Sequence, residues 1–535
     1  MEGSQNDMAR ISPNKLILLL CILAFVVTAA VAYFAFERLP HLEDEVAYLF
    51  QARTMALGRL TVSTPAVEES FWVPFVLDYQ GSRFGKYPPG WPGILSVGVL
   101  AGVPWLVNPL LAALSLYLIY RLGQTLYDER VGLLAAALGL VSPLFLVLSG
   151  SYLSHLASLV WLLLFSLWFI WTVQGRSRWF ALGAGLALGM AFLTRSLTAI
   201  AYAAPFILYS LVQVARRRQP HWARYLLVAV GGGVIAALLP AYQWAVTGDP
   251  WLNPYVLWWP YDRIGFGPDI GAMPGGHSIR YAWINLKQDL SRAATDVLGW
   301  PGLSWIPLVL GLALRPRRAR DWALLAPLAC LVFAYLFYWI GSPARLWGPR
   351  YYFEGFGGLW LLGAVGLLKV WDWNWDRKQE RPGLEPGQAT ALVFAGGQWL
   401  VGAVGLLKAL NWDSTRIRPW LRPVLAAALV LLVAGALAAN LPSRMGEAHG
   451  FYGITRSQLD PIEEAGLHDA LVFVYADRWL EYGAMLGEAS PLLDDDVVYA
   501  RGQTAGINAE VMAAYPDRAV YYLKDGVLSK EPPLP

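Results

Sequence analysis

Long apolar runs separated by short polar segments make up most of the chain from about residue 13 to residue 441. Runs of about 17 to 25 apolar residues are long enough to cross a bilayer as helices. We therefore predict eleven membrane spans, the first of them a retained anchor. They lie at residues 16–36, 106–122, 131–149, 154–173, 179–194, 199–215, 224–246, 302–314, 322–340, 353–370 and 423–441.

The pattern changes beyond residue 442, where apolar residues become sparser. The runs "ALVFVYA", "DDVVYARG" and "AVYYLKDG" predict strands, and "RWLEYGAMLGEA" and "INAEVMAAYP" predict helices. We therefore expect a transmembrane domain at 1–441 and a small soluble α/β domain at 442–535. The latter has no Gly-rich phosphate loop or nucleophile constellation, which favours acceptor docking or a stabilising cap over catalysis.

Basic residues gather in the loops "QGRSR", "ARRRQPHWAR" and "RPRRARD", which all fall on one side of the predicted spans. The positive-inside rule makes that side cytoplasmic. The outer face then carries a first long loop at 37–93, a second at 248–301 and the shorter "GSPARLWGPR" loop. We expect a multi-pass plasma-membrane protein whose longest loops are extracytoplasmic.

One internal repeat affects the topology. The segment "GGLWLLGAVGLLKVWDW" from Gly357 recurs as "GGQWLVGAVGLLKALNW" from Gly396. Basic residues flank the second copy on both sides, so we expect it to be re-entrant or interfacial, which gives eleven spans and an outside C-terminus. If the copy crosses the bilayer, the chain has twelve spans and an inside C-terminus.

Composition agrees with a membrane protein, because 56% of the residues are hydrophobic, 15% are charged and the mean hydropathy is +0.43. The net charge of +3 and the scattered basic clusters give no indication of nucleic-acid binding. Both cysteines, Cys21 and Cys330, lie in apolar runs, which argues against a disulfide framework or a thiolate metal site.

Three carboxylates, Glu43, Asp44 and Glu45, follow the first predicted span in "HLEDEVAYLFQARTMALG". The apolar spacing of this stretch predicts an amphipathic helix lying along the membrane surface. The carboxylates would stand at its N-terminus, where they either complement the helix dipole or perform chemistry.

The first outer loop closes with "SRFGKYPPGWPGIL", in which Lys86 precedes Tyr87 and two prolines. Prolines stiffen the chain, so this turn would hold one ammonium group at headgroup depth. Such a group either binds a phosphate or snorkels to the headgroups.

Other polar residues stand near the outer ends of predicted spans. Arg195 lies in "FLTRSLTA", and Arg345 and Arg350 lie in "GSPARLWGPRYYFEG". A charge beside lipid is costly, so each arginine is a candidate phosphate ligand, with snorkelling as the alternative. His155 and His277 are candidate substrate contacts or hydrogen-bonded structural residues.

The second long loop, "TGDPWLNPYVLWWPYDRIGFGPDIGAMPGGHSIR", is rich in aromatic residues. An interfacial aromatic belt explains most of them, although such rings also stack on sugars or prenyl chains. We expect Asp262 and Arg263 to pair within this loop and to order it over the site.

Together these motifs resemble the GT-C membrane glycosyltransferases. An acidic "DE" pair after the first span, the Lys-Tyr-Pro-Pro-Gly turn, "PLFLVLSGSYLSH" and "FLTRS" occur in the family's order over roughly residues 10 to 370. The nearest branch is the protein-mannosyltransferase and aminoarabinose-transferase type, described in bacteria as family 39-like. The resemblance implies an all-α polytopic fold of about eleven or twelve transmembrane helices, here followed by the α/β appendage.

The resemblance also implies a function. A sugar, hexose or pentose, would move from a polyprenyl-phosphate donor to a hydroxyl or amine on a glycan, lipid or protein acceptor at the outer face. Asp44 matches the family's acidic residue at the reacting centre, with Glu45 as the adjacent candidate, and Lys86 matches its phosphate-binding lysine. We expect Arg195, Arg345 and Arg350 to join Lys86 in binding the donor phosphate, and the candidate substrate contacts are Tyr87, His155, Asp262, Arg263 and His277.

A divalent metal stays open, but no metal ligand is predicted. Gly85 precedes Lys86 where the aminoarabinose branch carries an acidic residue, which argues against a metal site of that type. The competing class is a polyprenyl-linked sugar transporter or flippase that cleaves no bond. Transporter sites lie near the bilayer midplane, whereas the charged residues here gather at one face.

Overall fold

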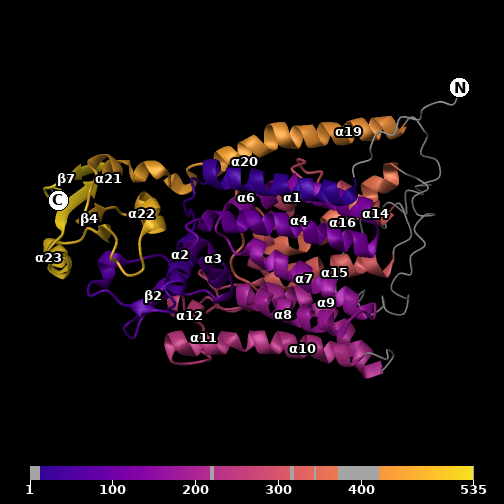
Figure 1. Cartoon of the computed structure of the whole chain (residues 1–535), viewed down its shortest axis with the longest axis horizontal. Helices are drawn as coiled ribbons and strands as arrows, with labels where there is room; N and C mark the ends of the chain where they lie inside the picture. Colours follow the sequence, from indigo (N-terminus) through magenta and orange to yellow (C-terminus); the bar gives the residue numbers. More distant parts are fainter. Residues whose placement is uncertain (1–11, 217–221, 314–317, 343–344, 372–420, 534–535) are drawn as a thin grey trace.

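The computed structural model describes residues 12–216, 222–313, 318–342, 345–371 and 421–533. Helices form a bundle, and a small sheet from the C-terminal part of the chain lies at one end of it (Figure 1). The bundle helices are α1 (Pro13–Ala30), α4 (Val107–Leu126), α5 (Glu129–Leu140), α6 (Pro143–Gly150), α7 (His155–Val173), α8 (Arg178–Thr194), α9 (Ser196–Arg216), α10 (Ala223–Ala236), α11 (Leu238–Thr247), α14 (Ile306–Ala313), α15 (Ala319–Tyr335), α16 (Phe356–Trp371) and α19 (Leu421–Gly435).

Several helices are long and apolar enough to cross a membrane. Within the described residues there are six such segments, Pro13–Ala35, Pro104–Leu126, His155–Val173, Ser196–Arg216, Ala223–Thr247 and Arg350–Trp371. The chain is therefore a multi-pass membrane protein, with shorter apolar helices such as α8 packed among these spans. The second copy of the repeat lies outside the described residues.

The predicted span 131–149 is not one straight helix. α5 and α6 meet there at an angle of 66°. Pro143 begins α6 and cannot donate a backbone hydrogen bond into a continuing helix, and the Ser142 hydroxyl caps the new helix instead. The proline therefore explains why a continuous apolar run becomes a bent pair.

The first outer loop folds into α2 (Glu43–Ala56), a three-stranded antiparallel sheet and α3 (Gly90–Leu100). The strands β1 (Val62–Ser63), β2 (Val76–Tyr79) and β3 (Ser82–Gly85) stand in the order β1-β3-β2. α2 was predicted as a surface helix, and this is wrong, because most of its residues are buried. It packs against α3 on one side and against α22 (Gly483–Glu488) of the C-terminal region on another.

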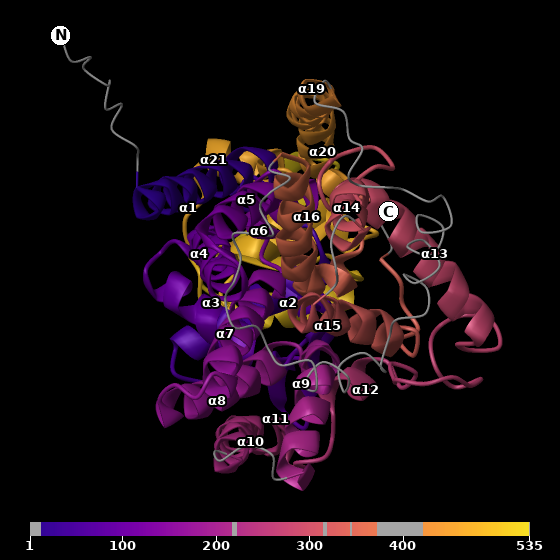
Figure 2. The same cartoon turned by 90° about the vertical axis from the view of Figure 1, so that its right-hand side faces the viewer.

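The second long loop contains helices that the sequence did not predict. α12 (Pro254–Trp258) lies toward the end of the bundle that carries the C-terminal sheet (Figure 1), and α13 (Ile279–Asp296) runs along the outside of the bundle (Figure 2). Ser278 caps α13, which buries only Ala282, Asp289, Ala293 and Asp296. Its charged residues occur at helical spacing, which an analysis of apolar runs overlooks.

The C-terminal region forms a four-stranded sheet in the order β5-β4-β6-β7. The strands β4 (Ala470–Tyr475), β5 (Val497–Arg501) and β6 (Ala519–Lys524) are parallel, while β7 (Val527–Ser529) pairs antiparallel with β6. The predicted α/β fold is confirmed, and β7 is an addition. The other helices of this region are α20 (Leu441–Ala448), α21 (Asp460–Ala465) and α23 (Ala505–Ala514).

The C-terminal region packs on the first outer loop. Arg53 of α2 donates a hydrogen bond of 2.8 Å to the Ala489 carbonyl, and Leu39 joins the apolar cluster around Ile454. Helices α19 and α20 lead back along the bundle to this sheet (Figure 1). The C-terminal sheet and α2 therefore share one end of the molecule.

Candidate functional site

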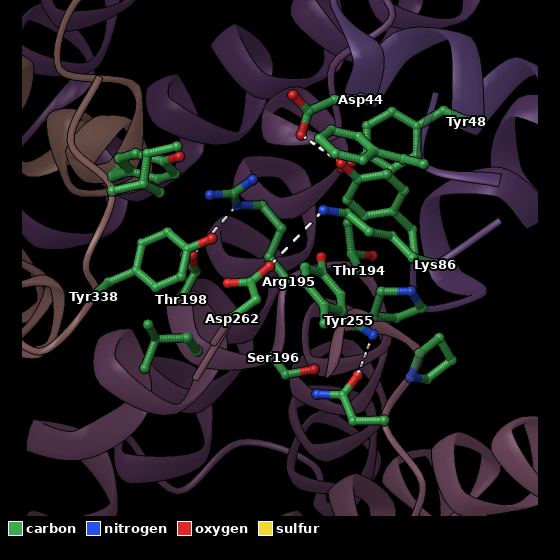
Figure 3. Close-up of a pocket in the computed structure, with 18 of the residues that line it drawn as sticks. Asp44, Tyr48, Lys86, Thr194, Arg195, Ser196, Thr198, Tyr255, Asp262 and Tyr338 are labelled. Atoms are coloured by element: carbon green, nitrogen blue, oxygen red, sulfur yellow. Dashed lines mark hydrogen bonds and ion pairs between the residues drawn. The ribbon is translucent and has the colours of Figure 1, made fainter. Parts of the chain in front are cut away.

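A cavity of about 500 Å³ opens where α2, the loop after β3, the α8–α9 junction and the second long loop meet. This size is typical of small-molecule sites. Figure 3 shows Asp44, Lys86, Arg195 and Asp262 converging on it. Seven predicted site residues line the cavity, namely Asp44, Lys86, Tyr87, His155, Arg195, Asp262 and Arg350.

Asp44 stands in the first turn of α2 with its carboxylate facing the cavity. Its Oδ1 accepts a hydrogen bond of 2.7 Å from the Tyr87 hydroxyl, and Arg350 Nη2 lies 3.8 Å from Oδ2. The side chain remains 24% exposed. Asp44 is therefore held in one orientation and is still able to meet a ligand.

The side chain of Lys86 ends in a cage of aromatic rings. Its Nζ lies 3.5 Å from the ring centroid of Phe75 and 4.7 Å from that of Trp259, with Tyr87 and Tyr255 slightly farther away. Burial lowers the pKa of Lys86 to about 8, although nearby carboxylates oppose the shift. The ammonium is thus poorly hydrated, which strengthens its attraction to an anion.

Asp262 does not form the predicted pair with Arg263. Its Oδ2 lies 3.8 Å from Lys86 Nζ, and its Oδ1 accepts a hydrogen bond of 2.9 Å from the Trp339 indole. Burial raises the pKa of Asp262. Asp262 pairs with Lys86 because the Lys86 ammonium is a buried positive charge close to it. Arg263 does not line the cavity.

Arg195 follows the last residue of α8, so the helix junction carries it into the cavity. Its Nε lies 3.2 Å from Glu354 Oε1, and its guanidinium donates hydrogen bonds to the hydroxyls of Tyr335 and Ser154 at 3.2 and 3.4 Å. Sequence reasoning missed Glu354, which is fully buried. A carboxylate inside the predicted span 353–370 was the available indication.

Arg350 begins a short 3-10 turn, Arg350–Gly355, and its guanidinium is buried. Its Nη2 donates a hydrogen bond of 3.4 Å to the Tyr351 hydroxyl. Its Nε and Nη1 have no hydrogen-bond partner among the described residues. Buried donors without partners are costly, so these N–H groups favour an anionic ligand in the cavity.

His155 lines the cavity at the start of α7, and its Nδ1 lies 3.4 Å from Glu354 Oε1. It therefore belongs to the same buried cluster as Arg195. His277 is elsewhere, with its Nε2 2.9 Å from the Leu336 carbonyl oxygen. His277 does not line the cavity.

Glu45 and Arg345 also lie away from the cavity. Glu45 accepts hydrogen bonds from the backbone N–H groups of His41, Leu42 and Tyr152 at 2.7, 3.1 and 2.7 Å. Burial raises its pKa to about 7. Arg345 is 71% exposed and pairs with Glu447 at 3.8 Å. Glu45 thus anchors the start of α2, and Arg345 faces outward.

A second cavity, of about 410 Å³, forms an apolar groove between α9 and α10 over α7 and α8. Its walls are almost entirely aliphatic and aromatic. On three helical segments, a residue that lines the groove stands within three positions of a residue that lines the polar cavity. These pairs are Phe192 and Thr194, Ala199 and Thr198, and Ala236 and Leu239.

The described residues contain no group of three or more His, Cys, Asp or Glu side chains placed to hold a metal ion. Three carboxylates line the cavity, namely Glu43, Asp44 and Asp262. Asp44 is hydrogen-bonded by Tyr87, and Asp262 contacts Lys86 and Trp339 instead. The residues present thus do not form a metal site of the ordinary kind.

Comparisons with known proteins address the fold. Residues 97–244 match the family model for dolichyl-phosphate-mannose-protein mannosyltransferase. The structure of ArnT from Cupriavidus metallidurans bound to undecaprenyl phosphate matches with a TM-score of 0.54 and 17% identity, over 94% of this chain and 89% of that one. The chain has the GT-C fold. The resemblance found in the sequence is thereby confirmed at the level of fold.

Other GT-C structures align less closely. ArnT from Cupriavidus metallidurans in the apo state gives a TM-score of 0.48 and 17% identity, over 93% of this chain and 88% of that chain. The Archaeoglobus fulgidus oligosaccharyltransferase in the apo form gives a TM-score of 0.43 and 12% identity, over 88% of this chain and 64% of that chain. No curated protein matches the chain in sequence.

Proposed function

We propose that this GT-C protein is a membrane glycosyltransferase that moves a sugar from a polyprenyl-phosphate donor to an acceptor hydroxyl or amine. The transfer would occur at the extracytoplasmic face of the plasma membrane. One observation carries the proposal: Asp44, Lys86, Arg195 and Arg350 line one cavity, and an apolar groove is formed by helices that also lead to this cavity. That combination suits a ligand with a phosphate, a sugar and a long hydrocarbon chain.

Asp44 is the candidate general base. The acceptor oxygen or nitrogen attacks the anomeric carbon of the donor sugar, and Asp44 takes the proton that the acceptor loses. Tyr87 and Arg350 fix the carboxylate so that one oxygen faces the cavity. General base catalysis of this kind contributes typically about 10²- to 10⁴-fold in rate.

The cations would serve the leaving group. As the bond between the anomeric carbon and the phosphate oxygen breaks, its electron pair stays on the phosphate, which departs as polyprenyl phosphate. Lys86 and the two unpaired N–H groups of Arg350 can stabilise that charge. Arg195 is held by Glu354 with its guanidinium at the same cavity.

The apolar groove would hold the first part of the prenyl chain. It lies among α8, α9 and α10, three helices whose apolar composition fits the bilayer, and the same helices also supply residues to the polar cavity or lead to residues that do. A polyprenyl phosphate with its phosphate near Lys86 could therefore extend its chain into the groove. ArnT, whose fold this chain shares, was crystallised with undecaprenyl phosphate, which also supports a polyprenyl donor.

The test uses purified protein, a panel of radiolabelled undecaprenyl-phosphate hexoses and pentoses, and oligosaccharides and peptides as acceptors. We expect release of undecaprenyl phosphate together with transfer of label to a polar product. Asp44→Asn should keep donor binding but reduce turnover by about 10²- to 10⁴-fold, because the shape stays while the proton acceptor is lost. Wild-type turnover in that variant would remove Asp44 from the role.

Transport without chemistry is the competing function. The cavity lies at one end of the bundle, together with α2 and the C-terminal sheet, rather than at midheight, where transporter sites are found. Movement of intact labelled donor across proteoliposomes, with no release of undecaprenyl phosphate, would establish the transporter and contradict the transferase.

A further inference from the structure

A tyrosine from the C-terminal region lines the cavity. Tyr452 lies in the turn Gly450–Gly453 and has a φ of 60°, a left-handed conformation that is strained for a tyrosine. Its glycine neighbours Gly450 and Gly453 also have positive φ, at 63° and 76°. Such strain persists only where the surroundings impose it, and it occurs preferentially at functional sites.

The surroundings of the turn do hold it in place. The ring of Phe451 packs edge-on against Trp347, with 5.8 Å between centroids. On the other side Ile454 is fully buried, and its carbonyl oxygen lies 3.1 Å from the Nε2 atom of His41. Tyr452 stands between these two anchors and is nevertheless 43% exposed. Its ring is therefore presented to the cavity by a fixed turn.

Glu43 lines the same cavity and has no role in the mechanism above. It precedes Asp44 in the first turn of α2, and the Trp479 side chain hydrogen-bonds to it. Burial raises its pKa. Glu43, Arg350 and Tyr452 all line the cavity.

We propose that Glu43 and Tyr452 form an acceptor subsite and that the acceptor is a saccharide. This inference rests on the proposed function and adds the acceptor's chemical class. A sugar ring has an apolar face, on which a phenol ring can stack. It also has adjacent hydroxyl groups, which can donate hydrogen bonds to a carboxylate. Asp44, the next residue, is then placed to take the proton of the reacting hydroxyl.

We assign the donor and the acceptor to different residues of the cavity. Lys86, with its aromatic cage, and Arg195 suit the donor phosphate, whereas Glu43 would repel an anion placed beside it. The acceptor subsite also contains residues from both α2 and the C-terminal region, which pack on each other. The C-terminal region would thus complete the acceptor site.

The test measures sugar transfer from the donor that the panel identifies to a set of manno-, gluco- and N-acetylglucosamine oligosaccharides, with a Ser/Thr-rich peptide as the competing acceptor class. The variants are Tyr452→Ala, Tyr452→Phe and Glu43→Gln, with Trp251→Ala as the matched control. Trp251 is 84% exposed and lies outside the cavity. Donor affinity is measured in parallel with undecaprenyl phosphate.

We expect transfer to oligosaccharides but not to the peptide. Tyr452→Ala and Glu43→Gln should raise the oligosaccharide KM at least tenfold and leave undecaprenyl phosphate affinity within twofold. Tyr452→Phe should keep the wild-type KM because it retains the ring, as should the control. Transfer to the peptide alone, or an unchanged KM in Tyr452→Ala, would overturn the subsite. Failure of wild-type protein to cleave any donor would instead overturn the proposed function.

Discussion

At the scale of single residues, Lys86 gives the site a pH dependence. Burial lowers its pKa to about 8, so the free protein loses this charge as the pH rises through about 8. The phosphate of a polyprenyl-phosphate sugar is a diester and stays anionic throughout. Donor affinity should therefore be full below pH 7 and fall by up to tenfold per pH unit above pH 8, as measured by equilibrium binding.

Asp262 provides the control for that prediction. Its carboxylate lies 3.8 Å from Lys86 Nζ and raises the pKa of the lysine. Asp262→Asn should move the alkaline fall in donor affinity to lower pH. Lys86→Ala should remove the fall and weaken binding by about 10- to 100-fold, more than Lys86→Arg does. A fall that survives in Lys86→Ala would assign the titration to another group.

The sequence predicted the residue types of this site better than their partners. Asp44 and Lys86 were selected because they match the acidic residue and the lysine of the family that the motifs resemble, and both line the cavity. Glu45 stayed the adjacent candidate, since only the fold shows that it bonds three backbone N–H groups. Tyr452 carried no indication at all, because its position depends on packing between distant segments.

At the scale of elements, the groove between α9 and α10 predicts a dependence on prenyl chain length. Ala229 lines the groove and is solvent-exposed in the described structure, so a larger side chain there would fill space without disturbing the core. Ala229→Phe should weaken undecaprenyl phosphate binding about tenfold, the equivalent of roughly two CH₂ groups at about 0.8 kcal/mol each. Binding of geranyl phosphate should hardly change, since its chain is short.

Val230→Phe is the matched variant for the groove, because it changes the next residue of α10 but faces away from the cavity wall. Both variants are compared in nanodiscs by displacement of labelled lipid. Equal effects of the two substitutions, or an equal loss for the short and long lipids, would show that the groove does not hold the prenyl chain.

Elements were predicted correctly where the local sequence pattern is enough to define them. They were predicted poorly where their burial depends on segments that are distant in the sequence. The long apolar spans and the short apolar strands of the C-terminal sheet follow from local pattern. α2 was placed on the membrane surface because its cover comes from α3 and from α22, more than 400 residues away in sequence. The strands of the first outer loop are only two to four residues long, too short for alternation to identify them.

At the scale of the whole molecule, the packing of the C-terminal region on α2 predicts that both lie on the same side of the membrane. The turn between α7 and α8 lies at the far end of the bundle, because α7 begins and α8 ends at the cavity. That turn belongs to the basic segment "QGRSR", which the positive-inside rule assigns to the cytoplasm. The cavity and the C-terminal region should then both lie outside.

Cysteine labelling tests this arrangement in a background in which Cys21 and Cys330 are replaced by alanine. Ser457 is an exposed residue of the C-terminal region, and Ser177 is an exposed residue of the α7–α8 turn. Ser457→Cys should react with a membrane-impermeant maleimide in spheroplasts, while Ser177→Cys should react only after permeabilisation. The reverse pattern would place the cavity on the cytoplasmic side of the membrane. The lipid-linked donor would then have to come from the inner leaflet, and the saccharide acceptor from the cytoplasmic side.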